Sequence, residues 1–288
     1  MPAPPLDREE YIEQAYFFRT YRERLDENIP SQEILNTIHE EVLSTTKLPM
    51  AIEFMKGEIV LHGHIGEAMS RLGHYFAPFQ AYIVARAEDD RSRFDQRTAL
   101  LILEREAEYR AGAWTPAGLF IYQFECLSRN RLGYDRGMTA MADDPMYDAA
   151  WRDWILKCRL QLGTVEFADL IYYRSEQYQL EQRRALREPE WTASQPLLFG
   201  AKEGRIARAN RSKDPLYMFA ALQRQLGYPA VPRPKGPSAD GNLSPAALDA
   251  RIKQLEKRQA LIDAELKGNL DLSQYYKPPE ETPEDTPE

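Results

Sequence analysis

Residues 144–163, DPMYDAAWRDWILKCRLQLG, decide the fold that the sequence predicts. An Asp followed by Pro is typical of a helix start, because the Asp oxygen accepts a free backbone N–H and Pro needs no partner at the first helical position. Gly163 suits the left-handed conformation that ends a helix. Apolar residues recur between the two ends at helical spacing, which predicts an amphipathic helix. They are Trp151, Trp154, Ile155, Cys158 and Leu162.

The same start signal occurs at three further places in the chain. These are Thr115-Pro116, Asp214-Pro215 and Ser244-Pro245. Asp7 and Glu10 have the spacing of a capping box, in which each side chain caps the backbone of the other residue. Period-2 alternation, which is typical of strands, is scarce. We therefore predict an all-α body over residues 7–228, built as a multi-helix bundle or helical array.

Residues 164–188 fit a further helix, which stops before Pro189. Thr164 is in place to cap it, and one face would carry apolar and aromatic side chains. That face consists of Phe167, Ile171, Arg174 and Tyr178. The stretch 165–174 also fits a strand, and this alternative stays open. Tyr172 and Tyr173 widen the aromatic surface here, for which core packing is a simpler interpretation than ligand binding.

The helical body is followed by a change in composition. Residues 229–243 are rich in Pro and Gly and predict a linker. Residues 244–268 predict a separate coiled-coil-like helix, whose narrow apolar seam has to pack against another surface. Residues 1–6 and the acidic residues 269–288 lack core formers and predict disorder. The seam consists of Leu248, Ile252, Leu255, Gln259, Ile262 and Leu266.

The composition favours a cytoplasmic protein and disfavours several functional classes. The 37 basic and 45 acidic residues give a net charge of −8, which makes a nucleic-acid binder unlikely on charge grounds. No apolar run is long enough for a membrane span, and the first residues lack the pattern of a signal peptide. Cys126 and Cys158 lie in apolar helical patterns, so we expect both thiols to be buried and reduced.

The histidines gather in one part of the chain. All four lie within residues 39–74, and two of them have a Glu three or four positions away. The candidate metal or acid–base residues are Glu58, His62, His64, Glu67 and His74. His62 and His64 would point to nearly opposite sides of a helix. The paired-helix signature Glu-x-x-His is missing, as is His-Glu-x-x-His. Packing or capping is therefore the preferred interpretation, and no cofactor is predicted.

A stripe of small residues crosses the same segment. It consists of Gly66, Ser70, Gly73 and Ala77. Because Gly is unfavourable inside a helix, two of them need a compensating reason. Close approach of a neighbouring helix is the preferred reason, and room for a ligand is the alternative.

A basic segment near residue 205 offers a different kind of site. Arg205, Arg208 and Arg211 recur at intervals of three residues, and Arg side chains suit phosphate or carboxylate recognition. A solvent-exposed basic face is the simplest interpretation. The alternatives are phosphate or nucleic-acid binding and the internal docking of an acidic element.

These observations favour an interaction or assembly protein over an enzyme. The helix at 244–268 would serve for self-association or for binding a protein partner. A metal protein or enzyme using the residues around 58–74 is the first alternative, and phosphate or nucleic-acid binding through the arginines is the second.

Overall fold

The structure is a computed structural model, and it describes residues 4–89, 91–92 and 94–233. The predicted all-α class is confirmed, since the described part contains thirteen helices and no named strand. The predicted helix at 244–268 and the tail at 269–288 lie outside the described residues. The helices are α1 (Arg8–Asp26), α2 (Ser31–Glu41), α3 (Leu48–His62), α4 (Ile65–Arg71), α5 (Pro78–Glu88), α6 (Gln96–Ala111), α7 (Pro116–Asn130), α8 (Tyr134–Ala142), α9 (Ala149–Gln161), α10 (Phe167–Tyr172), α11 (Glu176–Leu186), α12 (Ala201–Ala209) and α13 (Pro215–Leu226).

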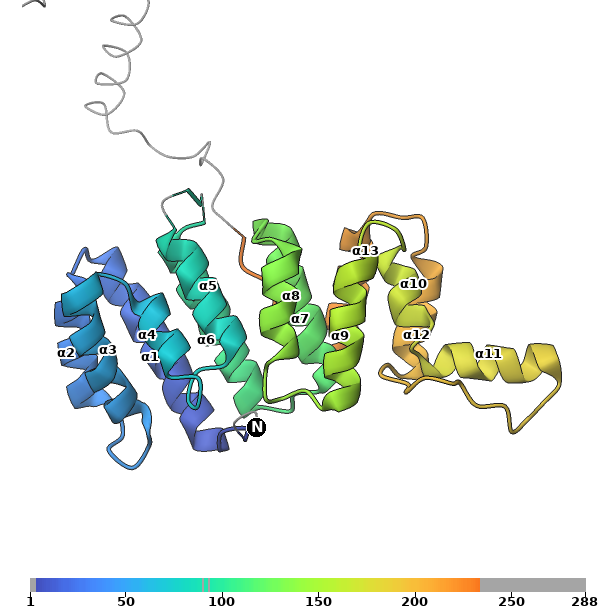
Figure 1. Ribbon diagram of the computed structural model, residues 1–288, viewed down its shortest axis with the longest axis horizontal. Helices are drawn as coiled ribbons and strands as arrows, with labels where there is room; N and C mark the ends of the chain where they lie inside the picture. Colours follow the sequence, from blue (N-terminus) through green and yellow to red (C-terminus); the bar gives the residue numbers. More distant parts are fainter. Residues whose placement is uncertain (1–3, 90, 93, 234–288) are drawn as a thin grey trace, which may run out of the picture. The chain divides into compact units, whose positions relative to one another are not determined.

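The helices of the unit Met1–Pro234 follow one another as packed neighbours (Figure 1). α1 packs most extensively against α6, although four helices separate the two in the chain, and α4 packs on α5. Further along, α8 packs on α9, while α7, α12 and α13 form the next group with α10. Each helix thus buries its apolar face mainly against a few neighbours, as in helical arrays.

Aromatic rings form much of the core in the second half of the unit. Phe124 of α7 stacks on Phe167 of α10 with ring centroids 4.0 Å apart, and Phe120 lies 4.7 Å from Trp154 of α9. Phe199, which precedes α12, joins the same cluster. The cluster therefore fixes α7, α9, α10 and the segment before α12 to one another.

The predicted start signals have different outcomes. Thr115 and Asp214 cap α7 and α13 with their side-chain oxygens, as predicted. Asp144 does not cap a helix: its carboxylate binds Arg110 and accepts the Met146 N–H at 3.0 Å, but the helix begins later, with Asp148 as its cap. Ser244 lies outside the described residues. A start signal in the sequence is thus overridden where a buried charge needs a partner.

Glu10 has a different partner from the predicted one. Asp7 is the N-cap of α1, but its side chain makes no capping bond. The Glu10 carboxylate instead accepts the Lys47 N–H at 2.9 Å, and Glu13 accepts the Leu43 N–H at 2.9 Å. Two carboxylates of α1 therefore hold both ends of the loop between α2 and α3.

The helix predicted over residues 164–188 is two helices. Residues 167–172 are helical and not a strand, but α10 ends there and Ser175 caps α11 through the Tyr178 N–H. At the break, the Arg174 carbonyl accepts the N–H groups of Leu198 and Phe199. A segment more than twenty residues later in the chain thus takes over the hydrogen bonds that a continuous helix would have used.

The described part of the predicted linker packs on the body. Asn130 donates a hydrogen bond to the Pro232 carbonyl at 3.2 Å, and Arg105 donates to that of Ala230. Residues 229–233 are therefore tied to α6 and α7. None of the described helices has the length and apolar character needed to span a membrane.

Candidate functional site

The histidine and glutamate candidates lie near one another in the chain but form no common centre. His62 ends α3, with its Nε2 atom 3.7 Å from Glu58 Oε2, whereas His64 is the N-cap residue of α4. Arg71 binds Glu58 and Glu67 at 2.8 Å each, so both carboxylates already have a cationic partner. Within the described ranges, no three His, Cys, Asp or Glu residues are grouped so that they could hold a metal ion.

The other two histidines are also separate from this pair. His39 lies on α2, with its Nε2 atom 3.8 Å from a Glu53 oxygen on α3. His74 borders a small cavity of about 10 Å³ together with Tyr11 and Tyr75. Such a volume has room for about one water molecule and excludes a substrate.

The small-residue stripe permits a close helix contact at one of its members. A Cβ atom on Gly66 would lie 2.8 Å from Glu88 Oε2 and 2.9 Å from the Ala85 nitrogen. The Glu88 carboxylate accepts the N–H groups of Ile65 and Gly66 at 2.7 and 2.9 Å, so it caps α4 from α5. Gly73 instead borders an open groove of about 470 Å³, whose one charged lining residue among the described ones, Glu67, is exposed and paired with Arg71.

Two of the three arginines in the basic segment are compensated inside the protein. Arg208 pairs with Glu181 of α11, and Arg211 pairs with Asp169 of α10. Arg205 is exposed and has no ion-pair partner among the described residues. The acidic partners thus come from neighbouring helices.

The side chains around Glu181 strongly affect its ionisation. Burial opposes ionisation of this carboxyl, but hydrogen bonds from Gln177 and Tyr172 and the pairing with Arg208 outweigh it and lower the pKa of Glu181 to about 2. Arg211 also stacks over the Tyr172 ring, with its guanidinium carbon 4.4 Å from the ring centroid. The basic segment therefore fastens α12 to α10 and α11.

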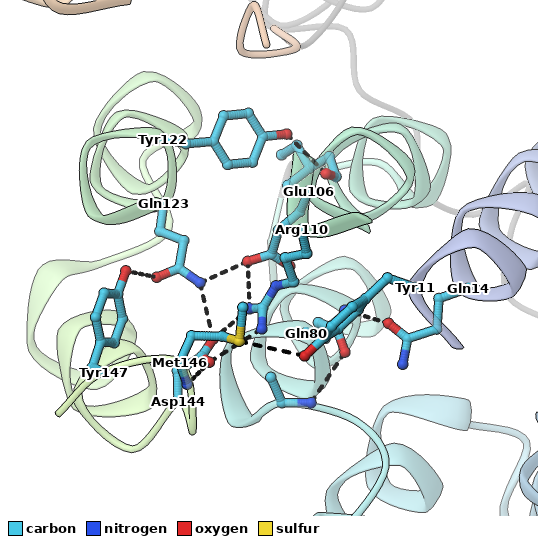
Figure 2. A network of polar contacts seen from close by, with 12 residues as sticks. Tyr11, Gln14, Gln80, Glu106, Arg110, Tyr122, Gln123, Asp144, Met146 and Tyr147 are labelled. Carbon is cyan, nitrogen blue, oxygen red and sulfur yellow. Dashed lines mark hydrogen bonds and ion pairs between the residues drawn. The ribbon is translucent and has the colours of Figure 1, made fainter. Parts of the chain in front are cut away.

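A buried polar network joins α6, α7 and the loop before α9 (Figure 2). The Arg110 guanidinium donates to Asp144 and, at 3.0 Å, to Glu106. Gln123 donates to Glu106 at 2.6 Å and to Asp144 at 3.2 Å, and its own oxygen accepts the Tyr147 hydroxyl at 2.8 Å. Two carboxylates thus share one cation and one amide.

The network extends toward α1 and α5. The Tyr11 hydroxyl donates to the Met146 sulfur, and the Arg110 guanidinium lies 5.8 Å from the centroid of the Tyr11 ring. Gln80 of α5 donates to Gln14 of α1 at 3.0 Å beside it (Figure 2). Four helices and one loop therefore contribute polar side chains to the middle of the core.

The burial of this network determines what it can do. Burial raises the pKa of Glu106, and the charge of Arg110 opposes this rise. Arg110 is 3% exposed, while Glu106 and Asp144 are buried as completely. The adjacent cavity is the water-sized one beside His74. The network resembles a catalytic cluster in composition, but among the described residues we find no substrate-sized opening that reaches it, so its geometry supports a structural role.

The outer face of α3 is the most apolar exposed surface on any one described helix. The inner face of this helix packs into the core through Ile52, Met55 and Ile59. On the outer side, Met50 and Leu61 are both 73% exposed, with further apolar side chains between them. The exposed set is Met50, Phe54, Val60 and Leu61, and we call it the α3 outer face.

Comparison of the chain with protein-family models, with curated proteins and with solved structures finds no match. Function is therefore argued from the residues of this chain.

Proposed function

We propose that this chain is an assembly protein, in which the α3 outer face of one copy binds the C-terminal segment 244–268 of a second copy. The observation that carries the proposal is the exposure of apolar side chains along α3. Contact of such side chains with water is unfavourable, and binding a second apolar surface would remove it. A reciprocal exchange of this kind gives a closed two-fold dimer.

The spacing of the two surfaces supports their pairing. Met50, Phe54, Gly57 and Leu61 follow one another at intervals of four, three and four residues. The seam of the C-terminal segment has the same intervals, starting from Leu248 and Ile252. Two helices with a shared heptad spacing pack along a common line. A Cβ atom placed on Gly57 would meet no atom within 4 Å, so the middle of the α3 outer face is open.

The length of the chain beyond the described residues supports this occupant. The described chain is held on α6 and α7 through Ala230 and Pro232. Residues 234–243 follow before the predicted helix, and ten extended residues span up to about 35 Å. This reach is long enough for the segment to leave its own body and lie on another copy.

The two cysteines fit the cytoplasmic location that we propose for this assembly. Cys126 and Cys158 are free thiols in the core, and burial raises the pKa of both. Thiols kept protonated and buried are typical of proteins from reducing compartments.

The test uses the full chain and charge substitutions at matched positions. Leu61→Glu on α3 and Leu255→Glu in the seam should each raise the dimer dissociation constant at least tenfold, because each loses about 1.5–3 kcal/mol of apolar burial. Leu160→Glu on α9 is the control, since Leu160 is 75% exposed and lies away from α3. Sedimentation over a range of protein concentrations measures all three variants.

Mixing the two variants tests the exchange itself. A Leu61→Glu copy retains its seam, and a Leu255→Glu copy retains its α3 outer face, so one contact re-forms and association partly returns. A coiled coil between two C-terminal segments would show no such rescue. The proposal fails if the full-length protein stays monomeric at all concentrations, or if mixing restores nothing.

A further inference from the structure

Two arginines are buried in the described part of the chain, and they differ in their partners. Arg110 is 3% exposed and contacts two carboxylates. Arg174 is 8% exposed, yet no described carboxylate lies within 4.0 Å of it. Burial also lowers the pKa of Arg174, and only the Cys158 thiol acts in the opposite direction, with no described carboxylate beside it. A buried guanidinium without an anion is unusual, because isolated buried charges are costly.

The break between α10 and α11 positions Arg174. Its carbonyl accepts two N–H groups from residues 198–199, and its Nη1 atom donates to the Pro196 carbonyl at 3.2 Å. Arg183 of α11 holds the same loop by donating to the Trp191 carbonyl at 2.8 Å. The loop 187–199 is thus tied to Arg174 at the break and to Arg183 on α11, and α11 projects from the rest of the unit in Figure 1.

Arg174 lines a cleft with aromatic walls. The cleft has a volume of about 220 Å³, and Tyr173, Tyr178 and Trp191 form its sides. The Tyr178 ring lies 5.3 Å from the Tyr173 ring and 6.0 Å from the Trp191 ring, centroid to centroid. Ser194 and Gln195 supply hydrogen-bonding groups at the remaining edge. The cleft thus combines a cation, aromatic faces and polar groups.

We propose that this cleft is a binding site for a small aromatic carboxylate. The guanidinium of Arg174 supplies a fork of donors that matches a carboxylate, and the rings of Tyr173, Tyr178 and Trp191 contact the flat, apolar part of the ligand. Sites for drug-sized ligands measure about 300–1,000 Å³, so this smaller cleft suits a single ring.

The charge of the cleft favours a carboxylate over a phosphate ester. Arg174 is the one cationic side chain that lines it among the described residues. One guanidinium balances a monoanion, whereas a phosphate monoester carries nearly two charges at neutral pH. The site shares no residue with the α3 outer face, so it stands apart from the assembly proposed above.

The probes are benzoate and its neutral analogue benzyl alcohol, each titrated into the full-length protein by calorimetry or NMR. The native protein should bind benzoate at least tenfold more tightly than benzyl alcohol, and more tightly than phenyl phosphate. Arg174→Met should weaken benzoate at least tenfold and leave benzyl alcohol unchanged. Arg205→Met is the control, because this exposed arginine also lacks an ionic partner, and it should change neither affinity.

Two results would overturn the proposal. The first is unchanged benzoate binding by Arg174→Met. The second is an equal loss of benzoate and benzyl alcohol, which would show that Arg174 only supports the loop. If Arg174→Met does not fold, Tyr173→Ala replaces it, since Tyr173 is half exposed. This variant should weaken benzoate severalfold, and unchanged affinity counts against the site. Binding of a peptide's C-terminal carboxylate without any binding of benzoate would assign the cleft to a protein tail instead.

Discussion

Arg110→Met should destabilise the protein by about 3–5 kcal/mol at neutral pH, which is the range for removing one partner of a buried ion pair. The substitution keeps the length of the side chain but leaves Glu106 and Asp144 without their shared cation. Gln123 still donates to both carboxylates. This partial compensation places the expected loss nearer the lower end of the range.

The loss should also depend on pH. Burial already raises the pKa of Glu106, and removing Arg110 takes away the charge that opposes this rise. A carboxyl whose pKa is higher in the folded state favours folding when protonated, and this contribution disappears as the pH rises through the folded-state pKa. The cost of Arg110→Met should therefore be smaller at about pH 5 than at about pH 8. In a protein that already carries Glu106→Gln, Arg110→Met should destabilise the fold less, and this loss should depend less on pH.

Urea unfolding of each variant, followed by circular dichroism at the two pH values, measures this difference in the free energy of unfolding. Arg152→Met is the matched control, because Arg152 and Asp143 form an ion pair of 2.8 Å with side chains 49% and 45% exposed. Exposed pairs contribute about 0–1 kcal/mol. If Arg110→Met costs no more than Arg152→Met, the network does not hold the core as described.

Two further predictions concern a helix contact and a surface carboxyl. Gly66→Ala should lower the free energy of unfolding by about 1–3 kcal/mol, since the new methyl group would overlap Glu88 and its surroundings. Gly57→Ala, where the space is open, should raise it by up to about 1 kcal/mol, and thermal or urea melts compare the two. The Glu181 carboxyl should titrate by NMR with a pKa of about 2, so its stabilising contribution is lost only as the pH falls toward that value. Arg208→Met should move this pKa back toward its ordinary range, and an unmoved pKa would show that the ion pair does not form in solution.

Local signals in the sequence predicted the helices well where no distant residue competed for the same group. Thr115 and Asp214 cap their helices as the Pro that follows each of them suggested. Asp144 carries the same signature, but Arg110 lies 34 positions earlier in the chain and binds its carboxylate. A sequence pattern that covers only the few residues around Asp144 therefore cannot reveal that Arg110 is its partner.

The candidate sites show the same division between local and distant information. The spacing of His62 and His64 already argued against a shared ligand set, and these residues do lie on separate helices or their ends. The Arg174 cleft was not predicted, because its walls come from the end of α10, from α11 and from the loop around Trp191. The helix break that brings them together depends on hydrogen bonds from residues 198–199. An aromatic surface at Tyr173 was the one trace of it in the sequence.

The pairing of α1 with α6 has a consequence for synthesis of the chain on the ribosome. Phe17, Phe18 and Tyr21 of α1 are buried in the finished protein, and α6 is the main partner of that helix. Residues 27–95 have to be translated before α6 begins, which takes seconds at about 5–20 residues per second. During this interval α1 can pack on α2 and α3, but it lacks its main partner. We therefore expect molecular chaperones to protect the protein most from aggregation while the nascent chain has this length.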